Sequence, residues 1–161
     1  MTTPEPPAPT PPGQPSLPSP LADWGTRALG WLIDWVPAAL LSAIFYRVAL
    51  FNVLAGLASI AYWGYIGHLE GVTGQTPGKA MMGTRLVGVN GQLIGSGSGI
   101  GRKFAHIVDG LICGLGFLLP LVDAKRQTIA DKLLDTYVVT GADKKPFAVD
   151  LWMPPKPASS D

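Results

Sequence analysis

Two consecutive apolar runs constrain this chain most strongly. Residues 28–46 form a run of 19 residues and residues 48–67 a run of 20, with only Arg47 between them. A helix needs about 20 predominantly apolar residues to cross the roughly 30 Å hydrocarbon layer of a bilayer. We therefore expect a mainly α-helical integral membrane protein in which two transmembrane helices are joined by a tight turn.

The first apolar run carries charge where hydrocarbon would surround it. Asp34 lies inside the run and Arg27 lies directly before it. An aspartate at the centre of a bilayer costs about 2.5 to 3.5 kcal/mol on insertion scales, so it persists only when it is paired or faces a protected interior. Seven residues are two helical turns, about 10.5 Å along one face, so each side chain needs a partner from another element.

A third apolar segment, residues 104–122, is interrupted by His106, Asp109, three glycines and a proline. Its uninterrupted part, residues 111–122, has 12 residues, and runs of about 10 to 14 residues are more often buried, interfacial or re-entrant than spanning. Lys and Arg residues flank the segment on both sides, which favours the cytoplasm for both flanks. We expect a re-entrant helical segment, with both chain termini on the cytoplasmic side of the plasma membrane. The alternative is a third transmembrane helix that places residues 123–161 outside.

The polar stretch at residues 70–103 predicts a small aqueous unit beside the membrane segments. Thr76 is followed by proline, which suits the N-cap and the first position of a short helix ending at Met82. The Gly- and Ser-rich run at residues 95–101 predicts a flexible connector before a helix that begins near Ile100.

Local signals predict a small cytoplasmic β element and one further helix. Asn90 and Gly91 are flanked by alternating residues, which is the strongest short-range signal for a β-hairpin. Residues 136–140, TYVVT, read as a strand, and this hairpin is the partner we expect for it. Thr128 and Asp131 have the spacing of a capping box for a short amphipathic helix.

Composition divides the chain into three regions. Residues 1–20 contain nine prolines and a single aliphatic residue, so we expect a disordered, partly polyproline II tail. Residues 21–140 would form the membrane domain, and residues 141–161 a flexible C-terminal tail. The first apolar run lacks the cationic lead and cleavage site of a signal peptide, so we expect it to remain attached.

Three motifs resemble those of the RDD family of small membrane proteins. They are Arg27 with Asp34 seven residues later, GQTPGKAMMGTRLV at residues 74–87 and RQTIADKLLDTYVV at residues 126–139. The resemblance covers about residues 22–140. The proline-rich head is similar to that of actinobacterial proline-rich antigens that carry this domain.

Matched motif by motif, the arginine and the two aspartates that name the family correspond to Arg27, Asp34 and Asp131. The chain departs from the family at the last motif, where the family often reads Asp-Leu-Leu-Ala-Gly-Thr and residues 131–136 read DKLLDT. The small Ala-Gly pair, which would permit close backbone packing, is absent here. The resemblance implies a multi-pass membrane protein for which transport of ions or small ligands is the expected role.

The third apolar segment repeats the charge spacing of the first one. Arg102, His106 and Asp109 lie at positions i, i+4 and i+7, on one face of a helix. We expect a charge cluster within the membrane to be the functional centre. Its candidate residues are Arg27, Asp34, Arg102, His106, Asp109 and Asp131.

Packing the two helix faces against each other would let their charges pair. Arg102 could meet Asp34, while Arg27 could meet Asp109 or Asp131. In one interpretation a desolvated carboxylate of the cluster alternates between protonated and ion-bound states. In the other, fixed ion pairs hold the helices together, because helices in lipid gain no hydrophobic drive to associate.

No motif supports an enzyme, a cofactor, a nucleotide or a nucleic acid. His106 and Asp109 could contribute to a metal site, but no third ligand lies nearby, so we expect no bound metal. GQTPGK, residues 74–79, lacks the first glycine of a phosphate-binding loop, and Ala80 stands in place of its Ser or Thr. The chain also lacks a nucleophile elbow and a basic, aromatic-rich face.

Two functional hypotheses follow. In the first, the protein transports ions or small solutes through the charge cluster, and it forms a homo-oligomer because so few spans cannot enclose a solute path. In the second, it is a non-enzymatic accessory or assembly subunit of a larger membrane complex, in which the charges are structural. Both hypotheses place the chain among membrane lipids.

Overall fold

The structure is a computed structural model that describes residues 20–45 and 49–153. It is mostly helical and carries a small sheet, so the predicted combination of helices with a minor β element is confirmed. Three parts of the predictions lie outside the described residues: residues 1–19 of the tail predicted at residues 1–20, Arg47 in the expected turn, and residues 154–161 of the C-terminal tail.

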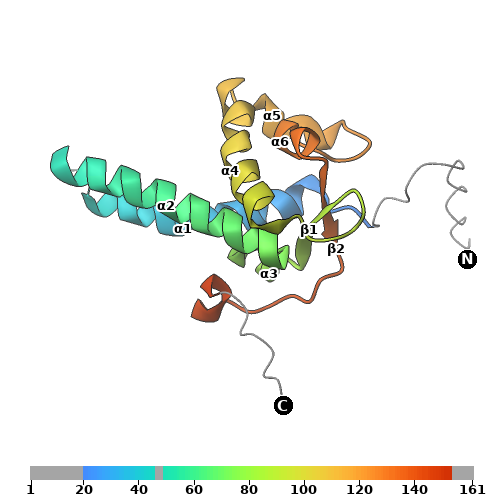
Figure 1. The fold of residues 1–161 in the computed structure, drawn as a ribbon, viewed down its shortest axis with the longest axis horizontal. Helices are drawn as coiled ribbons and strands as arrows, with labels where there is room; N and C mark the ends of the chain where they lie inside the picture. The colour runs from blue at the N-terminus through green and yellow to red at the C-terminus, as the bar shows by residue number, and fades with distance from the viewer. Residues whose placement is uncertain (1–19, 46–48, 154–161) are drawn as a thin grey trace, which may run out of the picture.

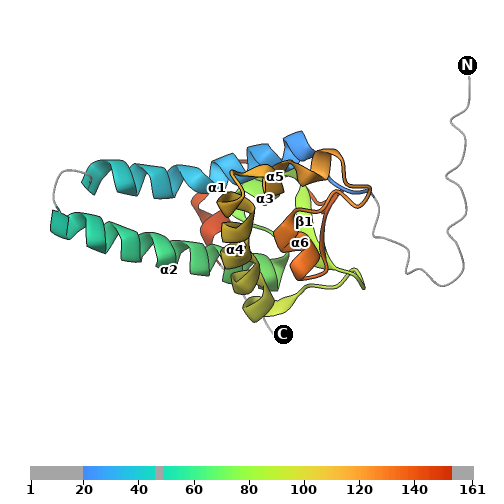
Figure 2. The same ribbon diagram turned by 90° about the horizontal axis from the view of Figure 1, so that it is seen from above.

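Two long helices dominate the shape. Helix α1 (Trp24–Phe45) and helix α2 (Ala49–Thr73) lie side by side and project from the rest of the molecule (Figures 1 and 2). Asp23 caps α1, because its carboxylate accepts hydrogen bonds from the backbone N–H and the hydroxyl of Thr26 at 2.9 and 2.6 Å. The two helices match the predicted apolar runs, but α2 continues past the expected end at Gly67.

The sheet joins two segments far apart in the sequence. Strand β1 (Thr84–Gly88) pairs antiparallel with strand β2 (Thr136–Thr140), as expected. The chain entering α1 lies along the other edge of β2, where the Ala22 N–H donates to the Val138 oxygen at 2.8 Å. Ala22, Leu86 and Val138 form a small apolar core beneath this sheet.

The predicted β-hairpin at Asn90 is wrong. The chain does turn there, since the Gly88 N–H donates to the Gln92 oxygen at 2.9 Å, but among the described residues no second strand follows. The edge of β1 that the strand would need is already occupied, because the Leu86 N–H donates to the Gly74 oxygen at 2.7 Å.

Two short helices begin at the caps read from the sequence. Helix α3 (Pro77–Met82) starts after Thr76, whose hydroxyl accepts the Lys79 N–H at 3.1 Å. Helix α6 (Ile129–Leu133) starts with the predicted capping box, in which Thr128 and Asp131 each accept the other's backbone N–H at 3.1 Å.

The predicted flexible connector at residues 95–101 is wrong, because these residues form the first turns of helix α4 (Gly95–Leu111). This helix crosses α2 at glycines. A Cβ atom on Gly71 would overlap the Gly95 carbonyl oxygen, and one on Gly99 would overlap the Gly67 carbonyl oxygen. Small residues four apart on both helices therefore bring the two backbones into contact, and this packing makes the glycine-rich run helical.

The segment at residues 104–122, predicted to be a re-entrant helical segment, contains a sharp bend between two helical parts. Helix α4 is followed by helix α5 (Leu115–Leu118) and the short 3₁₀ helix η1 (Leu119–Leu121), with a bend of 104° between the two parts. The bend lies at Cys113 and Gly114, which have φ values of 56° and 76°. Among described residues no single helix is both long and apolar enough to cross a bilayer. The two parts of this bent pair reach the required length and apolar composition only when they are taken together.

Part of the predicted C-terminal tail packs against the helices. The Lys145 N–H donates to the Ala80 oxygen at 3.0 Å, and the Tyr65 hydroxyl donates to the Trp152 oxygen at 2.5 Å. Trp152 belongs to the short 3₁₀ helix η2 (Val149–Trp152). These contacts hold residues 142–153 near α2 and α3.

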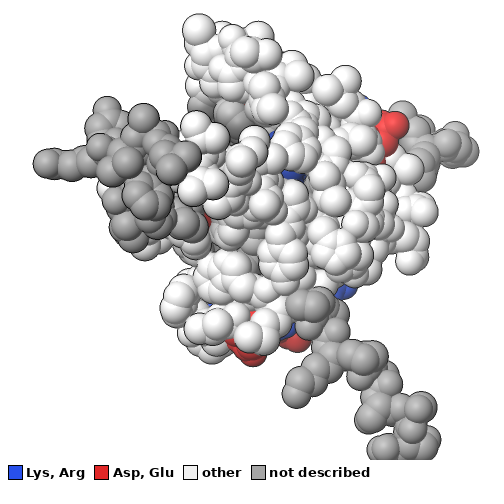
Figure 3. Space-filling model, turned by 60° about the vertical axis from the view of Figure 1, so that its left-hand side comes forward, with Lys and Arg blue, Asp and Glu red and all other residues white. Residues whose placement is uncertain are grey.

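The molecule buries charge and exposes apolar side chains. Leu57 of α2 is 59% exposed, Leu111 of α4 is 77% exposed, and Val122 after η1 is 85% exposed. Figure 3 shows a face on which nearly all described atoms belong to uncharged residues. Charged side chains that are at most 2% exposed include Asp34, Glu70, Arg102, Asp109 and Asp131. This distribution is the reverse of the one that water favours.

Candidate functional site

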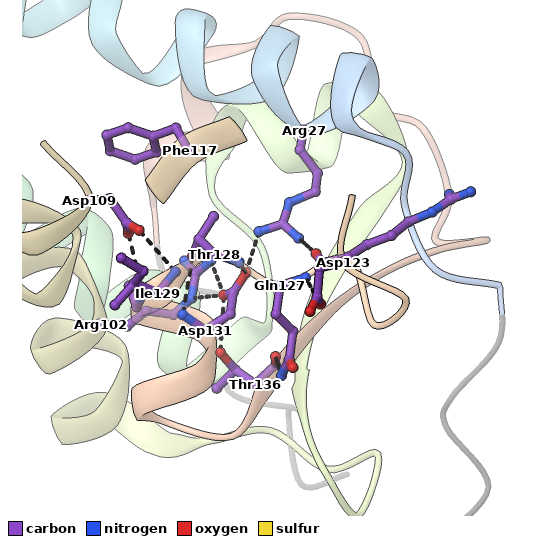
Figure 4. A network of polar contacts seen from close by, with 12 residues as sticks. Arg27, Arg102, Asp109, Phe117, Asp123, Gln127, Thr128, Ile129, Asp131 and Thr136 are labelled. Atoms are coloured by element: carbon purple, nitrogen blue, oxygen red, sulfur yellow. Dashed lines mark hydrogen bonds and ion pairs between the residues drawn. The ribbon is translucent and has the colours of Figure 1, made fainter. Parts of the chain in front are cut away.

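Asp131 is held between two arginines from different helices (Figure 4). Arg102 of α4 donates from Nε and Nη2 to Oδ1 of Asp131 at 2.8 and 2.6 Å, while Arg27 of α1 donates to Oδ2. Of the two partners expected for Arg27, Asp109 and Asp131, the structure pairs it with Asp131. Burial alone would raise the pKa of the Asp131 carboxyl, but Arg102 and Arg27 outweigh it and hold that pKa well below its usual range.

Glu70, near the end of α2, is the second buried carboxylate of the site. Lys79 lies 2.7 Å from its Oε1, Lys103 lies 3.1 Å from its Oε2, and the Arg102 Nη1 lies 3.3 Å from both oxygens. Burial raises the pKa of Glu70, but Lys103, Lys79 and Arg102 together lower it well below the usual value. Glu70 is therefore ionised in the folded protein.

Arg102 joins the two carboxylates into one network. It contacts both Glu70 and Asp131, and although burial lowers its pKa, these two neighbours raise it above the usual value. The expected pairing of Arg102 with Asp34 is wrong, because α4 turns Arg102 toward α2 and α6. The network, here called the charge network, consists of Arg27, Glu70, Lys79, Arg102, Lys103 and Asp131.

Asp34 and Asp109 position the two short helices. Asp34 Oδ1 accepts the Gly78 N–H at 2.7 Å, at the beginning of α3. Asp109 accepts the N–H groups of Ile129 and Ala130 at 2.9 and 3.3 Å, at the beginning of α6. Carboxylates are favourable at helix N-termini, where unpaired N–H groups and the helix dipole meet.

His106 contacts Asp109 and completes this part of the site. Its Nδ1 lies 2.8 Å from Asp109 Oδ2, and its ring stacks on Phe117 with the centroids 5.4 Å apart. Of the six residues predicted from the sequence, the structure brings Arg27, Arg102 and Asp131 together. It places Asp109 with His106 nearby, and Asp34 against α3.

Sequence reasoning missed Glu70, Lys79 and Lys103. The sequence contains a signal for Glu70, which is the only acidic residue between Asp34 and Asp109. A single carboxylate at the end of an apolar run needs compensating charge when it is buried.

A pocket of about 410 Å³ opens beside the charge network. It lies between α1 and the bent α4 and α5 segments. Trp24 and Phe117 both line it, and the Trp24 Nε1 donates a hydrogen bond to the Phe117 oxygen at 2.8 Å. Four cationic members of the network line it: Arg27, Lys79, Arg102 and Lys103. Its other walls are mainly apolar and aromatic.

The described part of the chain contains no group of three or more His, Cys, Asp or Glu residues arranged to hold a metal ion. Within those same residues, every buried nitrogen or oxygen of a side chain has a hydrogen-bond partner. The guanidinium and ammonium groups that line the pocket can form ion pairs and recognise anions.

Fold and site together define a small helical protein with a buried, ion-paired centre and apolar outer faces. The chain belongs to the RDD family, whose sequence pattern matches residues 21–135. The resemblance seen in the sequence motifs is thereby confirmed.

Similar proteins include two mycobacterial ones. The proline-rich antigen of Mycobacterium leprae (strain TN) is 35% identical over 145 residues, covering 70% of this chain and 58% of that protein. The proline-rich antigen homolog of Mycobacterium tuberculosis (strain ATCC 25618 / H37Rv) is 35% identical over 149 residues, covering 72% and 62%. The chain thus spans about 60% of the length of these relatives.

A more distant similarity reaches beyond mycobacteria. The uncharacterized protein YxaI of Bacillus subtilis (strain 168) is 31% identical over 83 residues, covering 50% of this chain and 52% of that protein. No solved structure matches this chain significantly.

Proposed function

We propose that this protein is a multi-pass protein of the plasma membrane. The reversed distribution of charge and apolar surface supports this placement. Exposed leucine, isoleucine, valine and tryptophan side chains on α1, α2, α4 and α5 would be an aggregation hazard in water, but lipid solvates them. The charged side chains that border these apolar faces point into the protein and are paired there, as charge beside lipid must be.

In the proposed topology the apolar runs at residues 28–46 and 48–67 cross the bilayer, and residues 104–122 re-enter it from the cytoplasmic side. The proposal takes each run at its full length, since no single helix within the described residues is by itself long and apolar enough. The sheet, α3, α6 and both termini would then face the cytoplasm. Cysteine labelling tests this in a Cys113→Ser background, which removes the native exposed thiol. A Ser159→Cys variant should react with a membrane-impermeant reagent only after the cells are opened. Labelling in intact cells would contradict the topology.

For the role, we propose transport of ions or small solutes at the charge network and its pocket. The observation that carries this proposal is that four cationic side chains of the network also line the pocket. A solute entering the pocket would meet groups that are already desolvated and oriented. Because so few helices cannot enclose a path, transport would require a homo-oligomer.

Flux in proteoliposomes tests the transport role. The purified protein should carry a measurable H⁺, K⁺ or Cl⁻ flux that Asp34→Asn reduces, because Asp34 lines the pocket. Lys125→Gln, a change at an exposed position outside the pocket, should leave the flux unchanged. A flux that Asp34→Asn leaves intact would place the transport site elsewhere.

The alternative is an accessory or assembly subunit of a membrane complex. Its support is that the charge network is already complete, since every buried polar side-chain atom in the described residues has a partner. Such a network stabilises a helix bundle without any solute. Affinity purification from native membranes distinguishes the two roles, because a stoichiometric complex of different proteins together with an absence of flux would favour the accessory role.

A further inference from the structure

We propose that the pocket binds the anionic phosphate headgroup of a membrane lipid, with the acyl chains leaving along the outer face of α1. The inference rests on the proposed membrane placement and is independent of transport. The pocket combines a cationic floor with apolar walls, which is the chemistry of an amphiphilic anion. Basic pockets between membrane helices on the cytoplasmic side bind acidic lipid headgroups in this way.

The charge network carries more positive than negative charge. Its four cationic side chains pair with two carboxylates, Glu70 and Asp131. Asp34 also lines the pocket, so four cations stand against three carboxylates there and the formal charge is +1. Asp34 accepts the Gly78 N–H of α3, and Asp109, which does not line the pocket, accepts N–H groups of α6. A bound phosphate would add negative charge beside this surplus.

The Lys79 ammonium is incompletely stabilised where it lies. Burial, reinforced by Lys103 and Arg102, lowers the pKa of Lys79 to about 8, although Glu70, 2.7 Å away, and Asp34 oppose this shift. An anion in the pocket would stabilise the protonated form.

The walls point to a lipid as the source of the phosphate. Residues of the apolar wall are Trp24, Leu29, Trp31, Leu32, Phe117 and Pro120. Leu29 and Leu32 are 52% and 56% exposed, so the wall continues onto the outer face of α1. Free phosphate would leave this apolar surface uncovered, whereas acyl chains would cover it.

The pocket suits a headgroup in size and access. Its volume of about 410 Å³ lies within the roughly 300 to 1,000 Å³ typical of small-molecule sites. In Figure 3, Lys or Arg atoms are visible in a recess near the centre of the view, where the surrounding atoms belong to uncharged residues. Because Leu29 and Leu32 line the pocket and are exposed, a headgroup can reach its cationic groups from the outer face of α1.

Native mass spectrometry of the full chain in a neutral detergent tests the proposal. The probes are phosphatidylglycerol, phosphatidylcholine with the same acyl chains, and inorganic phosphate. We expect one phosphatidylglycerol to bind about tenfold or more tightly than phosphatidylcholine, since an unneutralised headgroup forms charge-assisted hydrogen bonds. Equal binding of the two lipids would overturn the proposal. Phosphate that displaces phosphatidylglycerol at equal concentration would also overturn it, because the acyl chains would then contribute nothing.

Two variants locate the bound lipid. Ala28→Phe fills the pocket without touching an ion pair, and Lys79→Gln removes one cation while Glu70 keeps Lys103 and Arg102. Each should weaken phosphatidylglycerol binding by about tenfold, whereas the exposed control Lys125→Gln should not. Two results would overturn the proposal: phosphatidylglycerol binding by Ala28→Phe that equals that of the wild type, or a loss of binding in Lys125→Gln as large as that in Lys79→Gln. Either result would mean that the lipid binds outside the pocket.

This test separates the two proposals. Lipid binding is measured at equilibrium in detergent and requires no flux. Specific lipid binding without flux would support the lipid site and contradict the transport role. Flux without specific lipid binding would support the transport role and contradict the lipid site.

Discussion

Arg102 and Asp131 form the closest link between α4 and α6. Arg102 donates from Nε and Nη2 to a single oxygen of Asp131 at 2.8 and 2.6 Å, while its Nη1 points to Glu70. Arg102 is 2% exposed and Asp131 is fully buried. One side chain therefore ties the end of α2 to α4 and α6.

Replacing Arg102 should be severely destabilising. Arg102→Leu leaves Glu70 and Asp131 buried with one fewer cation each, and breaking a buried ion pair costs about 3 to 5 kcal/mol. Arg27→Leu should cost less, because Asp131 keeps Arg102. The free energy of unfolding in mixed micelles measures both.

Arg85→Gln is the matched control, since Arg85 is exposed on β1. It should change the unfolding free energy by at most about 0.5 kcal/mol. If Arg102→Leu proved no more harmful than Arg85→Gln, the network would contribute little to stability.

The glycine crossing of α2 and α4 predicts a position-specific effect of one methyl group. Gly71→Ala and Gly99→Ala should each lower the melting temperature, because the new Cβ would overlap the backbone of the facing helix. Gly97→Ala and Gly101→Ala, on the same helix as Gly99, have open space there. They should be neutral or stabilising by about 0.5 to 1 kcal/mol, since alanine favours helix. The same loss at all four positions would contradict the close crossing.

Acid should destabilise the folded state through Glu70 and Asp131. Both have pKa values below their usual range, so at acid pH the unfolded chain binds more protons than the folded one. Their stabilising contribution is present above the unfolded pKa values, about 4, and is lost as pH falls below them. Melting temperatures recorded from neutral to acid pH should therefore decline.

The Glu70→Gln variant should be less stable at neutral pH and show a shallower decline with acid. Asp143→Asn, at an exposed position, should follow the wild type. A wild-type melting temperature that stays constant to about pH 3 would show that these carboxylates are not held ionised.

Lipid binding should weaken as pH rises through about 8, the pKa of Lys79. Above that value Lys79 loses its charge, while the raised pKa of its neighbour Arg102 keeps that guanidinium charged, and Glu70 and Asp34 add no positive charge. Lys79→Arg keeps the charge throughout this range and should bind phosphatidylglycerol with little dependence on pH. A wild type and a Lys79→Arg variant with the same pH profile would exclude Lys79 from the site.

The sequence predicts the elements whose signals are local. Helices α3 and α6 begin where Thr76 and the Thr128–Asp131 box indicate, because a cap depends on residues within three positions of each other. The strand at residues 136–140 is likewise where its β-branched residues predict it.

Features that depend on tertiary partners could not be predicted in the same way. The turn at Asn90 forms, but Gly74 occupies the edge of β1 that a hairpin would use. The run at residues 95–101 is helical because α2 presents Gly67 and Gly71 to it, a contact that no local propensity expresses.

The contacts of the candidate site also depend on tertiary packing, so only some of them could be predicted from the sequence. The pairing of Arg27 with Asp131 could be anticipated from charge and spacing, whereas the partners of Arg102 depend on how α4 rotates against α2. Asp34 and Asp109 stabilise short helices that contribute free N–H groups. Charge counting alone does not reveal backbone partners of this kind.

The central claim is that the apolar side chains face lipid while the charges pair inside. A nitroxide label at Leu57, 59% exposed on α2, tests it most directly in liposomes, with a label at Arg85 for comparison. The account predicts that dissolved oxygen reaches the Leu57 label far more than a water-soluble nickel complex does, with the opposite preference at Arg85. Equal access of the nickel complex to both labels would contradict it.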